Sequence, residues 1–345
     1  MATQPKDYDT VTQDIVRWLD ATRYQGDQGE AGLWSYGVQS HKPWAVEASA
    51  LAVLTLQNIR QLGSVGELDA ITRTIQSRQE PDTGLFKDPL IGEADKTSDR
   101  LSWEHIWHHH TGVCVQALAA LEAKPLYPMP RQAFADFETI DVDEWTLGLD
   151  WTIPWTTGEH WAKAVNAYRM DRNLLEPDDL DTTLLKAFAT METRILNPEN
   201  GMPDLRGCDL AYQRVTGLFK LMFAYVPFGR DLPNPEKAID YILSVQREDG
   251  PFDIGGMGPN GDAIWALKHL SDQLDDRYRM SDIIDAGRRL NRYLIENHQK
   301  PDGGFSYNPD VCWETHNTIK VADLLPQGDP VGTLWASWCF RCVHE

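Results

Sequence analysis

One turn sequence recurs along the chain and limits the possible folds more than any other feature. Its glycine suits the left-handed backbone that ends a helix, its Pro or Asp stops the helix from continuing, and the aromatic residue after it packs back against that helix. Three copies are clear, one is looser and two are weaker: Gln79–Phe86, Gln246–Phe252, Gln299–Phe305, Gln25–Trp34, the surroundings of Gly148, and Asn200–Pro203. Such a period predicts six repeat units of about 50 to 60 residues.

Each unit is predicted to contain an outer helix, the turn and an inner helix. Segments 45–56 and 111–121 are apolar on nearly all sides, which is typical of helices packed on both faces, whereas 286–294 is amphipathic. The sixth inner helix is expected at Ile319–Leu325. Because such inner helices are buried on both sides only in a closed array, we expect an all-α fold, an (α/α)6 toroid. Its inner and outer helix rings would form one domain over residues 1–345.

Six hairpins joined by Gln-x-x-Asp-Gly-x-Phe/Trp turns resemble the repeat of the terpenoid cyclase and protein prenyltransferase superfamily. Its α/α toroid is shared by many polysaccharide lyases and glycoside hydrolases. The resemblance covers essentially the whole chain, and it implies that the segments entering the inner helices rim a central cavity. A turn motif is specific for the fold and weak for the reaction. The chemistry therefore has to be inferred from the residues at the six entries.

The composition of the chain limits which cellular compartment and which kinds of partner can be expected. A formal net charge of −20 disfavours nucleic acid and anionic membrane surfaces as partners. No apolar run has the about 18 residues of a membrane span, and the start Met1–Lys6 does not resemble a signal peptide. Five cysteines are an odd number, which suits a reducing compartment. We expect a cytoplasmic protein, or an exported one whose signal is absent from this sequence, with a small-molecule or glycan substrate; the oligomeric state stays open.

The entry Leu101–Gly112 is the richest in reactive groups, with four histidines, a glutamate and two tryptophans. Histidine is the natural general acid or base near neutral pH. The first entry adds Trp44 and Glu47. The residues expected to act in catalysis are Glu104, His109, His160, Tyr212, Glu314 and His316. Those expected to bind substrate are Trp44, Trp107, Glu159, Trp161, Asp209, Arg214, Asp262, Trp313 and Asn317.

These carboxylates, histidines and tryptophans, with few cations among them, are typical of carbohydrate chemistry. We therefore predict a lyase or glycoside hydrolase that acts on an oligosaccharide or polysaccharide without a cofactor. Hydrolysis would use Glu104 and Glu314 as facing carboxylates. Elimination would use His or Tyr as the base, with Asn317 or Arg214 polarising a substrate carboxylate. A terpenoid-cyclase-like or prenyltransferase-like enzyme acting on an isoprenoid is the first alternative, and a non-catalytic toroid that binds a partner is the second.

Two further motifs resemble sites of the superfamily. Asp310-Val-Cys312 resembles the Asp-x-Cys zinc pair of protein prenyltransferase β subunits, for which His316 would be a third ligand. A zinc site needs at least three protein ligands, and this motif supplies two. We therefore predict no metal there. The segment Glu176–Thr183 resembles the acid motif of class II terpenoid cyclases. Because it starts an outer helix, Leu184–Ile195, we interpret it as a helix N-cap.

Overall fold

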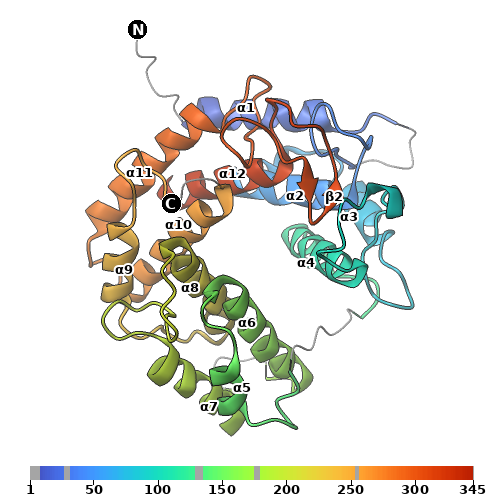
Figure 1. Ribbon diagram of the computed structural model, residues 1–345. Coiled ribbons are helices and arrows are strands. Elements are labelled where there is room, and N and C mark those ends of the chain that lie inside the picture. The colour runs from blue at the N-terminus through green and yellow to red at the C-terminus, as the bar shows by residue number, and fades with distance from the viewer. Residues whose placement is uncertain (1–7, 27–31, 129–134, 175–178, 253–255, 345) are drawn as a thin grey trace. The chain divides into compact units, whose positions relative to one another are not determined.

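The computed structural model describes residues 8–26, 32–128, 135–174, 179–252 and 256–344 (Figure 1). Over these ranges the chain is mostly helical, so the predicted all-α class is confirmed. The α-helices are α1 (Tyr8–Thr22), α2 (Val46–Asn58), α3 (Leu68–Gln76), α4 (Trp103–Ala120), α5 (Val142–Gly148), α6 (Pro154–Asp171), α7 (Thr182–Thr190), α8 (Ala211–Tyr225), α9 (Pro235–Ser244), α10 (Met257–Gln273), α11 (Met280–Asn297) and α12 (Pro330–His344). Short helical turns are η1 (Leu62–Ser64), η2 (Glu93–Asp95), η3 (Met191–Ile195) and η4 (Val226–Phe228), and the strands are β1 (Thr315–His316) and β2 (Ile319–Lys320).

The chain divides into two compact units. One contains residues 1–130, 255–258 and 291–345, and the other contains 131–254 and 259–290. In the first unit α2 packs against both α4 and α12 (Figure 1). In the second unit α6 packs against α8, and α5 against α7. Among the described residues, no helix is both long and apolar enough to cross a membrane.

The repeated turns have the predicted backbone. Gly32, Gly84, Gly201, Gly250 and Gly303 all have φ between +70° and +118°, the left-handed region. The glutamine of the motif closes the turn, since Gln79 Nε2 donates to the carbonyl of Gly84 at 2.9 Å and Gln246 Nε2 to that of Gly250 at 2.7 Å. Gly148 is instead the last residue of α5, and its backbone is not left-handed. The copy of the turn predicted there is therefore wrong.

The predicted helices at 45–56, 111–121 and 286–294 are confirmed as parts of α2, α4 and α11, with Ala45 as the N-cap of α2 and Leu121 as the C-cap of α4. Residues 184–195 are also helical, in α7 and η3. Asp181 caps α7 by accepting a hydrogen bond from the Leu184 amide at 2.9 Å, which confirms the N-cap interpretation of this part of the acidic segment. Residues 176–178 of that segment lie outside the described residues.

The sixth inner helix is not at Ile319–Leu325, and that prediction is wrong. The segment starts instead with β2, which pairs antiparallel with β1. The two-residue turn Asn317–Thr318 has φ of +48° and +68°, the pattern of a tight hairpin turn. The helix after this hairpin is α12, which begins at Pro330, and the Asp329 carboxylate caps it through the Gly332 amide at 2.7 Å.

Candidate active site

Glu47 is the centre of the densest cluster of titratable side chains that the described residues form. It lies in the first turn of α2 and is 0% exposed. Four donors surround its carboxylate. His109 Nδ1 lies 2.8 Å from Oε1, while Tyr36 Oη at 2.7 Å, His316 Nδ1 at 2.8 Å and His110 Nε2 at 3.1 Å face Oε2. Four donors are enough to satisfy a buried carboxylate.

Apolar packing brings these residues together from distant parts of the first unit. Tyr36 precedes α2, His109 and His110 are on α4, and His316 is on β1. The shared apolar cluster consists of Tyr36, Ala45, Ala48, Ile91, Ile106, Ile319 and Val321. The Thr97 amide also donates to the Thr318 carbonyl at 2.8 Å, which fixes the hairpin turn beside the segment that leads into α4.

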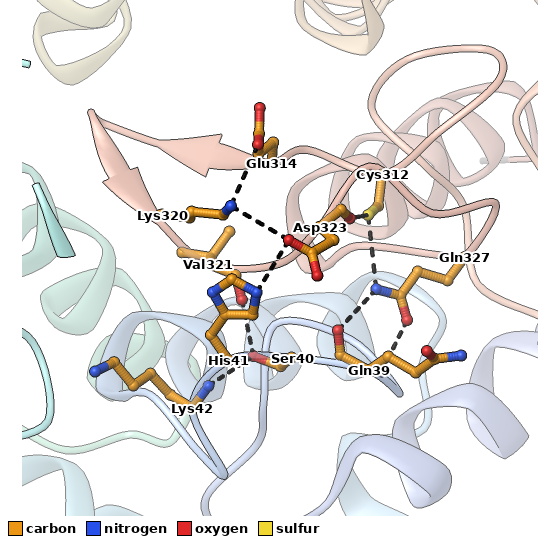
Figure 2. A network of polar contacts seen from close by, with 10 residues as sticks. All are labelled: Gln39, Ser40, His41, Lys42, Cys312, Glu314, Lys320, Val321, Asp323 and Gln327. Carbon is orange, nitrogen blue, oxygen red and sulfur yellow. Dashed lines mark hydrogen bonds and ion pairs between the residues drawn. The ribbon is translucent and has the colours of Figure 1, made fainter. Parts of the chain in front are cut away.

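Polar contacts fix the hairpin segment against the segment before α2 (Figure 2). Gln327 accepts from the Gln39 amide at 2.8 Å and donates to the Gln39 carbonyl at 3.1 Å. The His41 amide donates to the Val321 carbonyl at 3.0 Å, and the His41 ring lies 3.3 Å from Asp323. Lys320 lies between Asp323, at 3.2 Å, and Glu314 (Figure 2). These contacts hold in place the hairpin that carries His316.

Electrostatics keeps Glu47 ionised. Burial raises the pKa of this carboxyl, but the facing histidines, His110 first and His316 next, outweigh burial and hold the pKa well below its usual range. Burial, and then the charge of Glu47, raise the pKa of Tyr36 well above its ordinary value, so its hydroxyl keeps its proton and donates.

The ionised carboxylate determines the tautomers of the three histidines. Since a carboxylate only accepts hydrogen bonds, each ring nitrogen that faces it carries a proton. In their neutral forms His109 and His316 are therefore Nδ1–H tautomers with the lone pair on Nε2, whereas neutral His110 is an Nε2–H tautomer. The side chain of His109 is 40% exposed, that of His316 only 6%. Glu47 thus orients the ring of His109, the more exposed of the two, through Nδ1 and leaves Nε2 outside this hydrogen bond.

Aromatic rings extend from this cluster. The rings of Tyr307 and Trp313 stack with centroids 3.9 Å apart, and Trp313 also stacks on His316 at 5.0 Å. His109 meets the edge of His316 at 5.3 Å. Trp313 stacks with both Tyr307 and His316, so ring contacts join Tyr307 to the two imidazoles.

Several of the predicted residues lie in this cluster. His109 and His316 contact Glu47 directly, and Trp313 stacks on His316. Trp107 lies on the other side, with its ring centroid 5.2 Å from that of His110. Asn317 follows His316 in the hairpin turn, and its side-chain Nδ2 is buried without a hydrogen-bond partner.

Other predicted residues of the first unit have different surroundings. The side chain of Glu104 is 82% exposed and lies 3.9 Å from His108. Glu314 lies 3.6 Å from Lys320, at the edge of the hairpin. Trp44 is buried, with the Arg78 guanidinium 4.8 Å from the centre of its ring, so it packs in the interior. Neither glutamate takes part in the hydrogen bonds of the Glu47 cluster.

The suggested ligands Asp310 and Cys312 are not gathered with His316. Asp310 is exposed, and the Cys312 thiol donates to the Asp323 carbonyl at 3.2 Å. Among the described residues, the group of three potential metal ligands that lie close together is Glu47, His109 and His316.

The remaining predicted residues belong to the second unit. Trp161 is 0% exposed, and its ring packs on Phe188 at 5.7 Å, so it is a core residue. Glu159 forms ion pairs with Lys163 at 2.6 Å and Lys220 at 3.6 Å. His160 follows it on α6, half-buried, and burial lowers its pKa.

Four more of these residues lie on or near α8 and α10. Asp209 is exposed, and Tyr212 Oη accepts a hydrogen bond from the Gln213 side chain at 3.3 Å. Arg214 lies 3.7 Å from Asp204. Asp262 is only 2% exposed, and burial raises the pKa of its carboxyl to about 7 against the opposing effect of Lys220.

The sequence did not single out Tyr36. His110 was one of the four histidines of the reactive entry 101–112, and Glu47 was a candidate for the cavity at the first entry, but neither was placed among the expected catalytic residues. One signal for Glu47 was present, because it is a charged residue in the apolar segment 45–56. A charge in a helix packed on all sides requires buried partners. Its partner His316 is 269 residues away in the chain, a separation at which spacing has no predictive value.

Comparisons with known proteins identify neither a family nor a function for this chain. No family model matches the chain, and no curated protein matches it. Among solved structures, the type II terpene cyclase MstE from Scytonema is similar over 98% of both chains, with 13% identity and a TM-score of 0.48. A GH76 α-mannanase from Bacteroides thetaiotaomicron is similar over 98% of this chain and 95% of its own, with 9% identity and a TM-score of 0.42. Likeness at this level identifies no family and no reaction.

Proposed function

We propose that the protein is a carbohydrate-active enzyme, a lyase in which His109 is the general base. The observation that carries the proposal is the 2.8 Å hydrogen bond from His109 Nδ1 to the fully buried Glu47. A carboxylate behind an imidazole fixes its tautomer and stabilises the imidazolium that forms when the other nitrogen takes a proton. The partly exposed ring of His109 can meet a substrate.

The reaction that fits is β-elimination from a uronic-acid residue. His109 Nε2 takes the proton on the ring carbon beside the substrate carboxylate. The electrons of that C–H bond form a carbon–carbon double bond, the glycosidic C–O bond breaks, and the leaving oxygen receives the proton back from His109. Asn317, which follows His316, is the proposed donor to the substrate carboxylate; its buried Nδ2 has no partner and would have to turn out of the interior to donate. The edges of the stacked rings of Tyr307 and Trp313 would contact a neighbouring sugar.

Hydrolysis is less well supported because it needs two carboxyl groups on opposite sides of one bond. Glu47 is surrounded by donors that keep it ionised, so it is a poor general acid. In the part of the chain that the structure describes, neither Glu104 nor Glu314 is bound to this cluster, and Glu314 pairs with Lys320.

A panel of uronic-acid and neutral glycans tests the proposal. The expected result is new reducing ends together with the ultraviolet absorbance of an unsaturated product, on a uronic-acid glycan. His109→Ala should lower kcat by about 100-fold or more, as for loss of a general base. Glu104→Ala, on the same helix, and Glu314→Ala are the matched controls and should keep full activity.

Three outcomes would contradict the proposal. Reducing ends without unsaturated product, lost in Glu104→Ala or Glu314→Ala, would indicate a hydrolase. Turnover of an isoprenoid with no response to any glycan would indicate the terpenoid alternative. Full lyase activity in a folded His109→Ala variant would show that another group is the base.

A further inference from the structure

We infer that Glu47, His109 and His316 form a binding site for one divalent transition-metal ion of the zinc type. The inference concerns binding alone and goes beyond the proposed elimination. It depends on the convergence of one carboxylate and two imidazoles from α2, α4 and β1 in the first unit. One potential ligand atom from each residue lies within 4.8 Å of the others.

The spacing of the ligand atoms is close to that of a metal site. His109 Nδ1 and His316 Nδ1 each lie 2.8 Å from an oxygen of Glu47. Ligands bound at about 2.0–2.2 Å to one tetrahedral zinc ion lie about 3–3.5 Å from each other. An ion could replace the two hydrogen bonds if each imidazole moved by about half an ångström from its carboxylate oxygen. The ligand atoms of the two imidazoles, which lie within 4.8 Å of each other, would have to reach the same separation. Both histidines would then bind through Nδ1 and carry their proton on Nε2.

Donor type and exposure favour an ion with an open coordination position. Two imidazoles and one carboxylate form the ligand set of many catalytic zinc sites, in which water occupies the fourth position. The 40% exposure of His109 leaves a side of the cluster accessible to an ion and to water, while Glu47 is at the bottom with 0% exposure. The net charge of −20 also favours cation uptake.

The surroundings of the carboxylate already have the form of an outer ligand shell. Tyr36 Oη and His110 Nε2 both donate to Glu47 Oε2, so they can hold the carboxylate in place when the other two histidines turn to a metal. Outer-shell hydrogen bonds of this kind orient the ligands of metal sites. Oε1 accepts from His109 alone among the described residues, which leaves this oxygen available for the ion.

A metal on His109 would also affect the proposed reaction. With Nδ1 bound to the ion, Nε2 holds a proton and cannot accept another. Zinc is therefore expected to suppress the elimination, and a chelator to restore it.

Direct titration of the whole protein tests the inference. Protein treated with a chelator and then dialysed is titrated with Zn²⁺ by calorimetry and with Co²⁺ by visible absorbance. The expected result is one ion per chain, with His109→Ala and His316→Ala each weakening the affinity by about 100-fold or more, because loss of a ligand costs more than loss of an outer-shell partner. His41→Ala is the matched control, since the His41 ring pairs with Asp323 outside the site (Figure 2).

The inference is overturned if the wild-type protein takes up no ion, or if His109→Ala binds as tightly as His41→Ala. The partial exposure of His109 makes its alanine variant the safest for folding, which circular dichroism would check. No substrate is needed, so the two proposals fail separately. Lyase activity without metal uptake would overturn only the metal site. Metal uptake without action on any glycan would overturn only the proposed function.

Discussion

At the scale of single residues, the main feature is an ionised glutamate that is fully buried and surrounded by four donors. Removing water from a carboxylate costs several kcal/mol, and hydrogen bonds in the interior have to offset that cost. Tyr36, His109, His110 and His316 provide them. A buried charge kept at this cost, with one imidazole left exposed, is a common mark of a functional site.

Tyr36→Phe should destabilise the protein by about 1–3 kcal/mol, because it removes one of the donors to the buried carboxylate. The free energy of unfolding, measured by chemical denaturation, checks this. Tyr127→Phe removes a hydroxyl from a tyrosine that is 37% exposed and should change stability little. Equal stabilities for both variants would mean that the hydroxyl of Tyr36 contributes nothing to holding Glu47.

At the scale of elements, the helices could be predicted from the sequence because their signals are local. The turn glycines, the apolar segments and the Asp181 cap each depend on residues within a few positions of one another. The hairpin was missed for a related reason. Buried Ile319 and Val321 alternate with the half-exposed Lys320, which is a strand pattern, but at this length it is hard to distinguish from a short helical run.

The hairpin turn stores backbone strain at Thr318. This β-branched residue has φ of +68°, and its buried hydroxyl lacks a partner. A left-handed conformation costs a residue with a side chain roughly 1–2 kcal/mol, and glycine is strongly favoured at the second position of such a turn. Thr318→Gly should therefore leave the protein as stable or more stable by about 1 kcal/mol in chemical denaturation. A loss of more than that would show that the threonine side chain is needed where it packs.

At the scale of the whole molecule, the amino-acid composition gives the net charge reliably. A net charge of −20 comes from 52 acidic and 32 basic side chains, and ion pairs such as Glu159–Lys163 and Asp240–Arg279 are partly exposed. Composition does not reveal which acids are buried. Glu47 and Asp262 are both buried acids, yet the pKa of the first is lowered by histidines and that of the second is raised to about 7 by burial. Only the folded surroundings separate them.

Asp262 should give stability a distinct dependence on pH. Its folded pKa of about 7 exceeds the ordinary aspartate value of 3.8, so the folded state holds the proton more tightly than the unfolded chain does. Its contribution is therefore most favourable below pH ~4, falls as the pH rises toward ~7, and is constant above that, a change of up to ~4 kcal/mol. Asp262→Asn should remove this slope from the unfolding free energy.

Comparison with the wild type at each pH is essential, because His298, whose burial lowers its pKa to about 4, contributes the opposite slope. Asp209→Asn, the same substitution at an exposed position, is the control and should leave the slope as it is. If Asp262→Asn and the wild type have parallel stability curves from pH 4 to 8, Asp262 does not titrate as described.

The candidate site was predictable in part. The dense entry 101–112 and the polar segment before the last helix indicated His109 and His316 as reactive groups. Their meeting at Glu47 was not predictable, because it depends on how α2, α4 and the hairpin pack within the first unit. The predicted pair of Glu104 and Glu314 had equally good local signals, but those side chains lie at exposed positions outside the hydrogen-bonded cluster.

The central claim is that one ionised glutamate orients two imidazoles with their Nε2 atoms bare. Long-range ¹H–¹⁵N NMR of the histidine side chains, in metal-free protein, tests it most directly. We expect Nδ1–H tautomers for His109 and His316 and the Nε2–H tautomer for His110, with the Nδ1–H preference lost in Glu47→Gln. Nε2–H tautomers of His109 and His316 in the wild-type protein, or spectra unchanged by Glu47→Gln, would contradict it.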